Sequence, residues 1–288
     1  MNPQFPQSIR IDISTELGES FALPPCGVPL DVLGGLVLPG NGARLHPRHT
    51  ISRDDDALLS CVSSASLACG AHSGDAIVLN RLVPQLIERG LHIGAHPSYP
   101  DVFRFGQHRI DMSPSELEAV ILSQLGWLGA ILKKYDRAIE HVKFHGRLNF
   151  DVAENPEATL AACRAIKAYD PDIILVISAG APCVELAKSQ GLRVAQEAFL
   201  DRGYGPDGMI VKRDRHDALL SDPEAAAQRA VEMVLDSQGT ATDGSHFPIH
   251  AETYCIHSDT PGALALMNAI RNALSERGIA VAGLASIV

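Results

Sequence analysis

Five clusters of polar residues recur along this chain, and each one follows a short apolar run. They contain carboxylates, imidazoles, hydroxyls and one lysine. Loops that leave the carboxyl ends of parallel strands converge on one face of an α/β protein, where active sites are built. The recurrence therefore predicts an enzyme with an α/β fold. The clusters span residues 12–19, 68–75, 94–101, 141–146 and 255–262.

About seven or eight expected strands alternate with expected helices from residue 9 to the end of the chain. Two capping boxes, Ser113–Glu116 and Ser221–Glu224, predict helix starts. The alternation favours a parallel (β/α) barrel, and we expect residues 1–288 to form a single domain. Residues 24–53 break the rhythm and predict an inserted loop, either a surface excursion or a basic lid over an anionic substrate.

Composition excludes several classes of protein. The net charge is −10 and no run of Lys or Arg exceeds two residues, so nothing indicates nucleic-acid binding. No apolar stretch approaches the roughly 20 residues of a membrane span. The six cysteines form no CxxC pair, and the first seven residues lack an apolar signal core. These features predict a cytoplasmic protein with reduced thiols.

The fourth cluster carries the strongest chemical signal. Lys143 and His145 lie two residues apart at an expected strand end, so their side chains should project from the same side. A lysine beside an imidazole can stabilise a developing oxyanion or move a proton. The alternative is a buried lysine that is paired with a carboxylate for structure alone.

The first cluster supplies carboxylates. Asp12 lies on the polar side of the first expected strand, and Glu16 follows where a turn begins. A buried carboxylate requires a cation, a metal or a hydrogen-bond donor. Glu16, His72 and His96 could form a metal site of two histidines and one carboxylate. Histidines that are satisfied by ordinary hydrogen bonds are the alternative.

Candidate substrate-binding residues follow two later strands. Glu197 and Arg202 should lie on the loop face, where an arginine suits a substrate carboxylate or phosphate. A structural ion pair explains the arginine equally well. His257 and Asp259 follow the last cluster's strand, although Asp259 is also well placed to cap the next helix.

Six ordered motifs resemble the LamB/YcsF family, the 5-oxoprolinase A-subunit proteins. They are LGESF, ACG-x-HSGD, GAHP-x-YPD, HVK-x-HG, EAF-x-DR-x-Y-x-x-DG and HSDTPGA, and they cover roughly residues 9–23 and 54 to the end. The resemblance implies a distorted seven-stranded (β/α) barrel of the glycoside hydrolase/deacetylase kind. Its polar motif residues correspond here to Asp12, Glu19, His72, Asp75, His96, Asp101, Lys143, His145, Glu197, Asp201, Arg202, His257 and Asp259.

The resemblance also implies ATP-dependent opening of 5-oxo-L-proline to L-glutamate together with B and C partner subunits. On that hypothesis Lys143 and His145 act on the carbonyl group, and Arg202 holds the substrate carboxylate. Glu16 or Asp12, with the two histidines of the proposed metal site, would position water or a divalent metal. The sequence contains no Walker A motif, so we expect a partner to handle ATP.

Several positions depart from the family pattern, which usually has Asn at Ser14 and Asp at Glu16. Most departures fall on the expected loop face, where substrate would be recognised, while Lys143 and His145 are kept. The alternatives are therefore a stand-alone, metal-dependent enzyme acting on a different small amide or lactam, and a non-catalytic subunit of a complex. The oligomeric state, including a homo-oligomer, is open.

Overall fold

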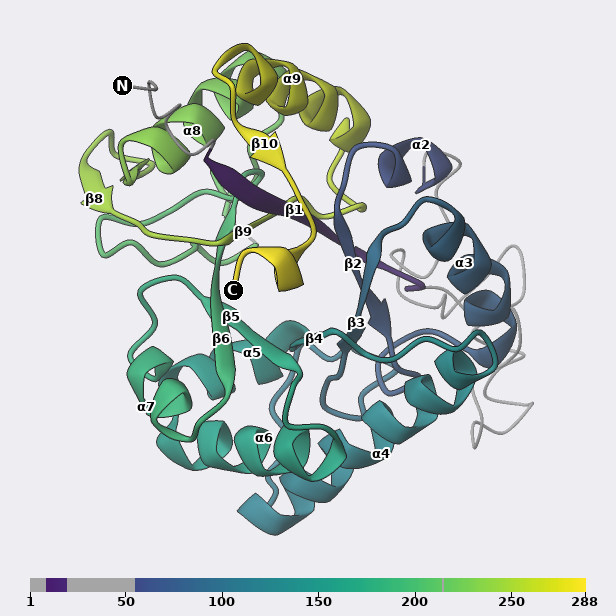
Figure 1. The fold of residues 1–288 in the computed structure, drawn as a ribbon. Coiled ribbons are helices and arrows are strands. Elements are labelled where there is room, and N and C mark those ends of the chain that lie inside the picture. Colours follow the sequence, from purple (N-terminus) through teal and green to yellow (C-terminus); the bar gives the residue numbers. More distant parts are fainter. Residues whose placement is uncertain (1–8, 20–54, 214) are drawn as a thin grey trace, which may run out of the picture.

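A ring of seven parallel strands forms the centre of the fold in the computed structural model, which describes residues 9–19, 55–213 and 215–288. β1 pairs in parallel with β2 on one side and with β9 on the other, which closes the ring (Figure 1). This confirms the distorted seven-stranded (β/α) barrel. The ring consists of β1 (Arg10–Leu17), β2 (Ser64–Ala68), β3 (His92–His96), β4 (His141–Lys143), β5 (Ile174–Ser178), β6 (Arg193–Phe199) and β9 (Thr253–Cys255).

Helices surround the barrel because their apolar faces pack on the outward side chains of the strands (Figure 1). The capping box at Ser113 is confirmed, since Glu116 closes it. At the second predicted box the cap is Asp222 instead of Ser221, because Pro223 occupies the first helical position. The helices are α2 (Asp55–Leu59), α3 (Ala76–Glu88), α4 (Pro114–Lys133), α5 (Gly146–Glu154), α6 (Pro156–Tyr169), α7 (Val184–Ser189), α8 (Pro223–Leu235) and α9 (Ala263–Glu276).

The chain's last residues close the end of the barrel from which the strands start. β10 (Ala280–Val281) pairs with the first residues of β1 outside the ring. The 3₁₀ helix η2 (Leu284–Ser286) then lies over the centre of the ring in Figure 1. Its Leu284 packs against Ile174, Val176 and Ala195 inside the barrel. Ligands must therefore approach from the opposite end.

Two further elements have no counterpart in the sequence prediction. β7 (Gln238–Thr240) and β8 (His246–Pro248) form an antiparallel hairpin between α8 and β9. The predicted inserted loop at residues 24–53 lies outside the described residues. Among the described helices, α4 alone is long and apolar enough to cross a membrane by length and composition, which is weak evidence for a span. Its Ile121 and Leu125 side chains are fully buried in the core of the fold.

The barrel interior is tightly packed at Gly94 on β3. A methyl group placed on Gly94 would lie 2.2 Å from the ring of buried His141. We expect Gly94→Ala to lower the free energy of unfolding by about 1–3 kcal/mol, the usual cost of overpacking. Gly126→Ala is the control, because a methyl group there meets nothing within 4 Å; in a helix it should stabilise by about 0.5–1 kcal/mol. Urea denaturation of both variants checks this, and equal stabilities would contradict it.

Candidate functional site

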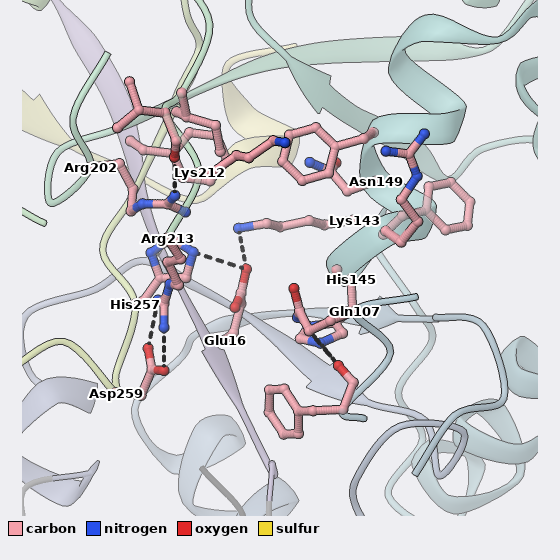
Figure 2. Close-up of a pocket in the computed structure, with 18 of the residues that line it drawn as sticks. Glu16, Gln107, Lys143, His145, Asn149, Arg202, Lys212, Arg213, His257 and Asp259 are labelled. Atoms are coloured by element: carbon pink, nitrogen blue, oxygen red, sulfur yellow. Dashed lines mark hydrogen bonds and ion pairs between the residues drawn. The ribbon is translucent and has the colours of Figure 1, made fainter. Parts of the chain in front are cut away.

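A cavity of about 850 Å³ opens at the carboxyl ends of the strands. Its inner wall consists of side chains from β1, β4 and β6, and the loops that follow the strands form its rim (Figure 2). This is the end of the barrel where the sequence predicts that the polar clusters meet. Figure 2 labels Glu16, Gln107, Lys143, His145, Asn149, Arg202, Lys212, Arg213, His257 and Asp259 among its lining residues.

Lys143 lies at the base of the cavity between two carboxylates. Its Nζ is 2.8 Å from Glu16 Oε1 and 2.9 Å from Glu197 Oε1, and it donates to Cys255 Sγ at 3.0 Å. Burial alone would lower the pKa of Lys143, but the neighbouring Cys255, Glu16 and Glu197 raise it well above its ordinary value. The lysine is therefore a fixed ammonium group. Lys143 on β4 and its three partners on β1, β6 and β9 come from distant parts of the chain.

The two carboxylates beside Lys143 differ in their tendency to ionise. Burial opposes ionisation of Glu16, but the charge of the adjacent Lys143 holds its pKa well below the usual range. Burial raises the pKa of Glu197, which the charge of Lys143 only partly offsets. Burial also raises the pKa of the Cys255 thiol well above its ordinary value. Glu16 is therefore the more readily ionised of the two carboxylates beside the ammonium.

Three histidines and Glu19 meet beside Glu16. His72 and His145 stack with ring centroids 3.7 Å apart, and His145 Nδ1 lies 3.0 Å from His96 Nε2. Glu19 Oε1 is 3.2 Å from His72 Nε2 and 3.3 Å from His145 Nδ1. His96 Nε2 is 3.5 Å from Glu16 Oε1, whereas His72 reaches Glu19. The three residues of the predicted metal site thus lie in one neighbourhood. The ligand atoms within 4.8 Å of one another, however, belong to Glu16, Glu19, His96 and His145, so His145 and Glu19 take the place predicted for His72.

Asp201 and His257 form a carboxylate–imidazole pair at the side of the cavity. Asp201 Oδ2 is 3.0 Å from His257 Nδ1 and accepts from the His257 backbone N–H at 3.1 Å; it also accepts from the Thr260 hydroxyl. Burial opposes ionisation of Asp201, but the hydrogen bonds from His257 and Thr260 lower its pKa. The carboxylate fixes the proton on Nδ1, which leaves Nε2 as an acceptor 3.9 Å from Glu16 Oε1.

The family of the protein is decided by comparison with known sequences. The sequence model of the LamB/YcsF family matches residues 44–288. The chain belongs to the LamB/YcsF family. A relative from Heliobacterium modesticaldum, named as the A subunit of 5-oxoprolinase, is 37% identical over 273 residues, covering 95% of this chain and 97% of the relative. Another of that name, from Chloroflexus aggregans, is 41% identical over 228 residues, covering 79% and 90%.

Solved structures agree with this assignment. The lactam utilization protein from Thermus thermophilus superposes with a TM-score of 0.80 at 33% identity, covering 96% of this chain and 100% of that one. A putative cellobiose-phosphate cleavage protein from Enterococcus faecalis gives a TM-score of 0.55 at 13% identity, covering 98% and 100%. The second match shows the shared fold alone.

The predicted substrate-binding residues of this LamB/YcsF protein are largely engaged with protein partners. Arg202 donates to the carbonyls of Ala218 at 3.2 Å and Val211 at 2.7 Å, so its guanidinium is fixed at the cavity wall by neutral acceptors. Asp259 accepts two hydrogen bonds from Arg213, at 2.7 and 2.9 Å. Sequence reasoning missed Arg213 because no periodic pattern marks the segment between β6 and α8.

Asp12 lies away from the cavity. Its carboxylate accepts from the hydroxyls of Ser63 and Ser64 at 2.7 Å each and from Thr253 at 2.6 Å, and burial raises its pKa. These donors satisfy the carboxylate near the closed end of the barrel. The structure therefore does not bring Asp12 to Lys143, with which the sequence groups it as catalytic. Asp12 contributes to this family member through packing and hydrogen bonding of the strands.

Proposed function

We propose that this chain is the lactam-opening subunit of a 5-oxoprolinase-type enzyme. The observation that carries the proposal is the ammonium group of Lys143, held by Glu16 and Glu197 at the base of a large cavity. A lactam carbonyl is a poor electrophile, and a fixed cation stabilises the negative charge that develops on its oxygen. The relatives named as 5-oxoprolinase A subunits and the lactam utilization protein support the same substrate class.

The residues around the cavity supply the groups that amide hydrolysis needs. Water adds to the carbonyl carbon, the ring C–N bond breaks, and the nitrogen takes a proton. Lys143 would donate to the carbonyl oxygen, while His257 Nε2 would accept a proton from the water and return it to the nitrogen. Asp201 keeps His257 in the tautomer that this task requires. Arg202, on the cavity wall, would attract the substrate carboxylate.

We assign ATP to partner subunits. The sequence has no Walker A motif, and relatives of this chain are named as one lettered subunit of 5-oxoprolinase, which supports the presence of others. Phosphorylation of the amide oxygen by a partner would make the carbonyl carbon more electrophilic. This chain would then receive the activated lactam and add water to that carbon, and cleavage of the C–N bond would leave an acyl phosphate. A second water would convert the acyl phosphate to the carboxylate of glutamate and inorganic phosphate.

Reconstitution tests this function. The purified chain is combined with 5-oxoprolinase B and C subunits, ATP and ¹³C-labelled 5-oxoproline, and labelled glutamate is measured by mass spectrometry. We expect glutamate only when all subunits and ATP are present. A family member with demonstrated activity replaces this chain as the positive control. Glutamate formation by the control but not by this folded chain would refute the proposal.

The size of the cavity favours one alternative substrate. At about 850 Å³ it lies near the upper end of the roughly 300–1,000 Å³ range of small-molecule sites, whereas 5-oxoproline is a single five-membered ring. A larger lactam, opened without partner subunits, would use this space more fully. Incubating the chain alone with a panel of larger lactams and measuring the amino acid products by mass spectrometry distinguishes the two substrates.

A further inference from the structure

Two histidine nitrogens face each other at the edge of the cavity, and both are acceptors in the neutral rings. His96 Nδ1 lies 2.8 Å from the Lys143 carbonyl, and His145 Nε2 lies 2.8 Å from the Phe105 carbonyl. A carbonyl oxygen carries no hydrogen, so both of these ring nitrogens must be the N–H donors. The lone pairs of the other two nitrogens, His96 Nε2 and His145 Nδ1, then point at one another across 3.0 Å.

One contact disagrees with this tautomer of His145. The Gln107 amide nitrogen lies 3.3 Å from His145 Nε2, which would place two donors against each other. The same amide nitrogen donates to the Phe105 carbonyl at 3.3 Å, so it does not need His145 as an acceptor. A backbone carbonyl, by contrast, can only accept. The shorter contact to Phe105 therefore decides the tautomer.

Two carboxylates face the same point as the two lone pairs. Glu19 Oε1 is 3.3 Å from His145 Nδ1, and Glu16 Oε1 is 3.5 Å from His96 Nε2. One ligand atom from each of these four residues lies within 4.8 Å of all the others. Two imidazole nitrogens and two carboxylate oxygens this close together match the ligand set of a transition-metal ion.

We propose that Glu16, Glu19, His96 and His145 bind one divalent transition-metal ion. The outward N–H of each histidine is held by a backbone carbonyl, which is how proteins orient metal-binding imidazoles. Two imidazoles with two carboxylates suit Zn²⁺ or Mn²⁺ better than Mg²⁺ or Ca²⁺, which prefer oxygen ligands alone. The two carboxylates balance the charge of such an ion.

A second group of donors, Glu16, Cys255 and His257, is less suitable. The ammonium of Lys143 lies 3.0 Å from Cys255 Sγ and 2.8 Å from Glu16 Oε1, so this corner already contains a cation. A metal ion there would be repelled by Lys143. The ammonium contacts two of the three ligands of this group, whereas in the four-residue site it contacts Glu16 alone. The four-residue site also offers one more ligand, and it is favoured for both reasons.

The ion's use in catalysis rests on the function proposed above. Glu16, Glu19 and His145 line the same cavity as Lys143, so a bound ion would supply a Lewis acid within reach of a substrate there. Binding of the ion itself depends only on the four residues. The two proposals can therefore be tested separately.

The test uses the full-length chain after removal of metals with a chelator. Zn²⁺ and Mn²⁺ are titrated in separate experiments by isothermal calorimetry, with the unfolding temperature measured in parallel. We expect one equivalent of at least one ion to bind and to raise the unfolding temperature. Glu19→Gln keeps the shape of the side chain but removes its charge, and it should weaken metal binding at least about tenfold. Mutation of a residue that only supports a metal ligand already lowers the affinity by about 10–100-fold, so loss of a ligand should cost at least as much. His145→Gln should weaken it further.

Controls separate this site from surface binding and from misfolding. His246→Gln removes an exposed histidine on the β7–β8 hairpin and should leave the affinity unchanged. Circular dichroism checks that each variant is folded. Substoichiometric binding of both ions, or an affinity unchanged by Glu19→Gln and His145→Gln, would overturn the metal site. Stoichiometric metal binding without glutamate formation would refute the proposed function but not the metal site. Glutamate formation by the metal-free protein would show that the reaction does not require the ion.

Discussion

Lys143→Met is expected to lower the rate of lactam opening by about 10²–10³-fold, the usual cost of removing a group that stabilises a developing oxyanion. The change also leaves Glu16 and Glu197 buried without their common partner. Breaking a buried ion pair in this way typically costs about 3–5 kcal/mol of stability. Loss of activity in this variant alone would therefore have two explanations.

A double variant separates the two effects. Lys143→Met combined with Glu197→Gln removes one of the two carboxylates that the single change leaves unpaired. Because Glu16 remains, we expect the double variant to recover part of the lost stability in urea denaturation, but none of the activity in the reconstituted assay. A double variant that is both stable and active would show that Lys143 has only the structural role that the sequence leaves open.

Asp201→Asn is expected to lower kcat by about 10²–10⁴-fold, the range of general acid–base catalysis. The carboxylate holds the proton on His257 Nδ1. An asparagine can donate to that nitrogen and shift the proton to Nε2, where it removes the acceptor that faces the cavity. KM should change little, because substrate binding does not use this proton.

Thr260→Val is the matched control for Asp201→Asn. It removes another hydrogen bond to the same carboxylate without changing the contact with His257. We expect it to affect stability but to lower kcat by less than about tenfold, below the range of an acid–base group. The ¹⁵N chemical shifts of the His257 ring report the tautomer directly. An Asp201→Asn protein with an unchanged tautomer and normal kcat would refute the role of Asp201.

The alternation of residues in the first strand predicts which side chains share one side of the strand. It does not predict how far along the barrel each side chain lies. The pattern places both Asp12 and Glu16 at polar positions of that strand and its end, and both are buried in the structure. At about 3.3 Å per residue the two positions are separated by roughly 13 Å along the strand. That distance places Asp12 among the hydroxyls near the closed end and Glu16 in the cavity.

Contacts between loops lie beyond prediction from a single sequence. Lys143 and the motif histidines could be found because they follow strands with clear apolar patterns. Their partners depend on which strand ends face each other across the barrel, which no local pattern contains. The pair formed by Arg213 and Asp259 joins residues 46 apart, and Arg213 lies in a segment without periodicity. The fold is therefore more predictable than the pairing of charges within it.

The closure of the ring at β1 and β9 has a consequence for the synthesis of the protein. The Thr15 hydroxyl donates to the carbonyl of Ile256, a residue 241 positions later in the chain. At translation rates of about 5–20 residues per second, a ribosome needs roughly ten seconds or more to connect them. Until then one edge of β1 lacks its native neighbour, and Glu16 keeps its hydration. β1, the first strand that the structure describes, is thus among the last to be enclosed, and the nascent chain must remain unaggregated until β9 emerges.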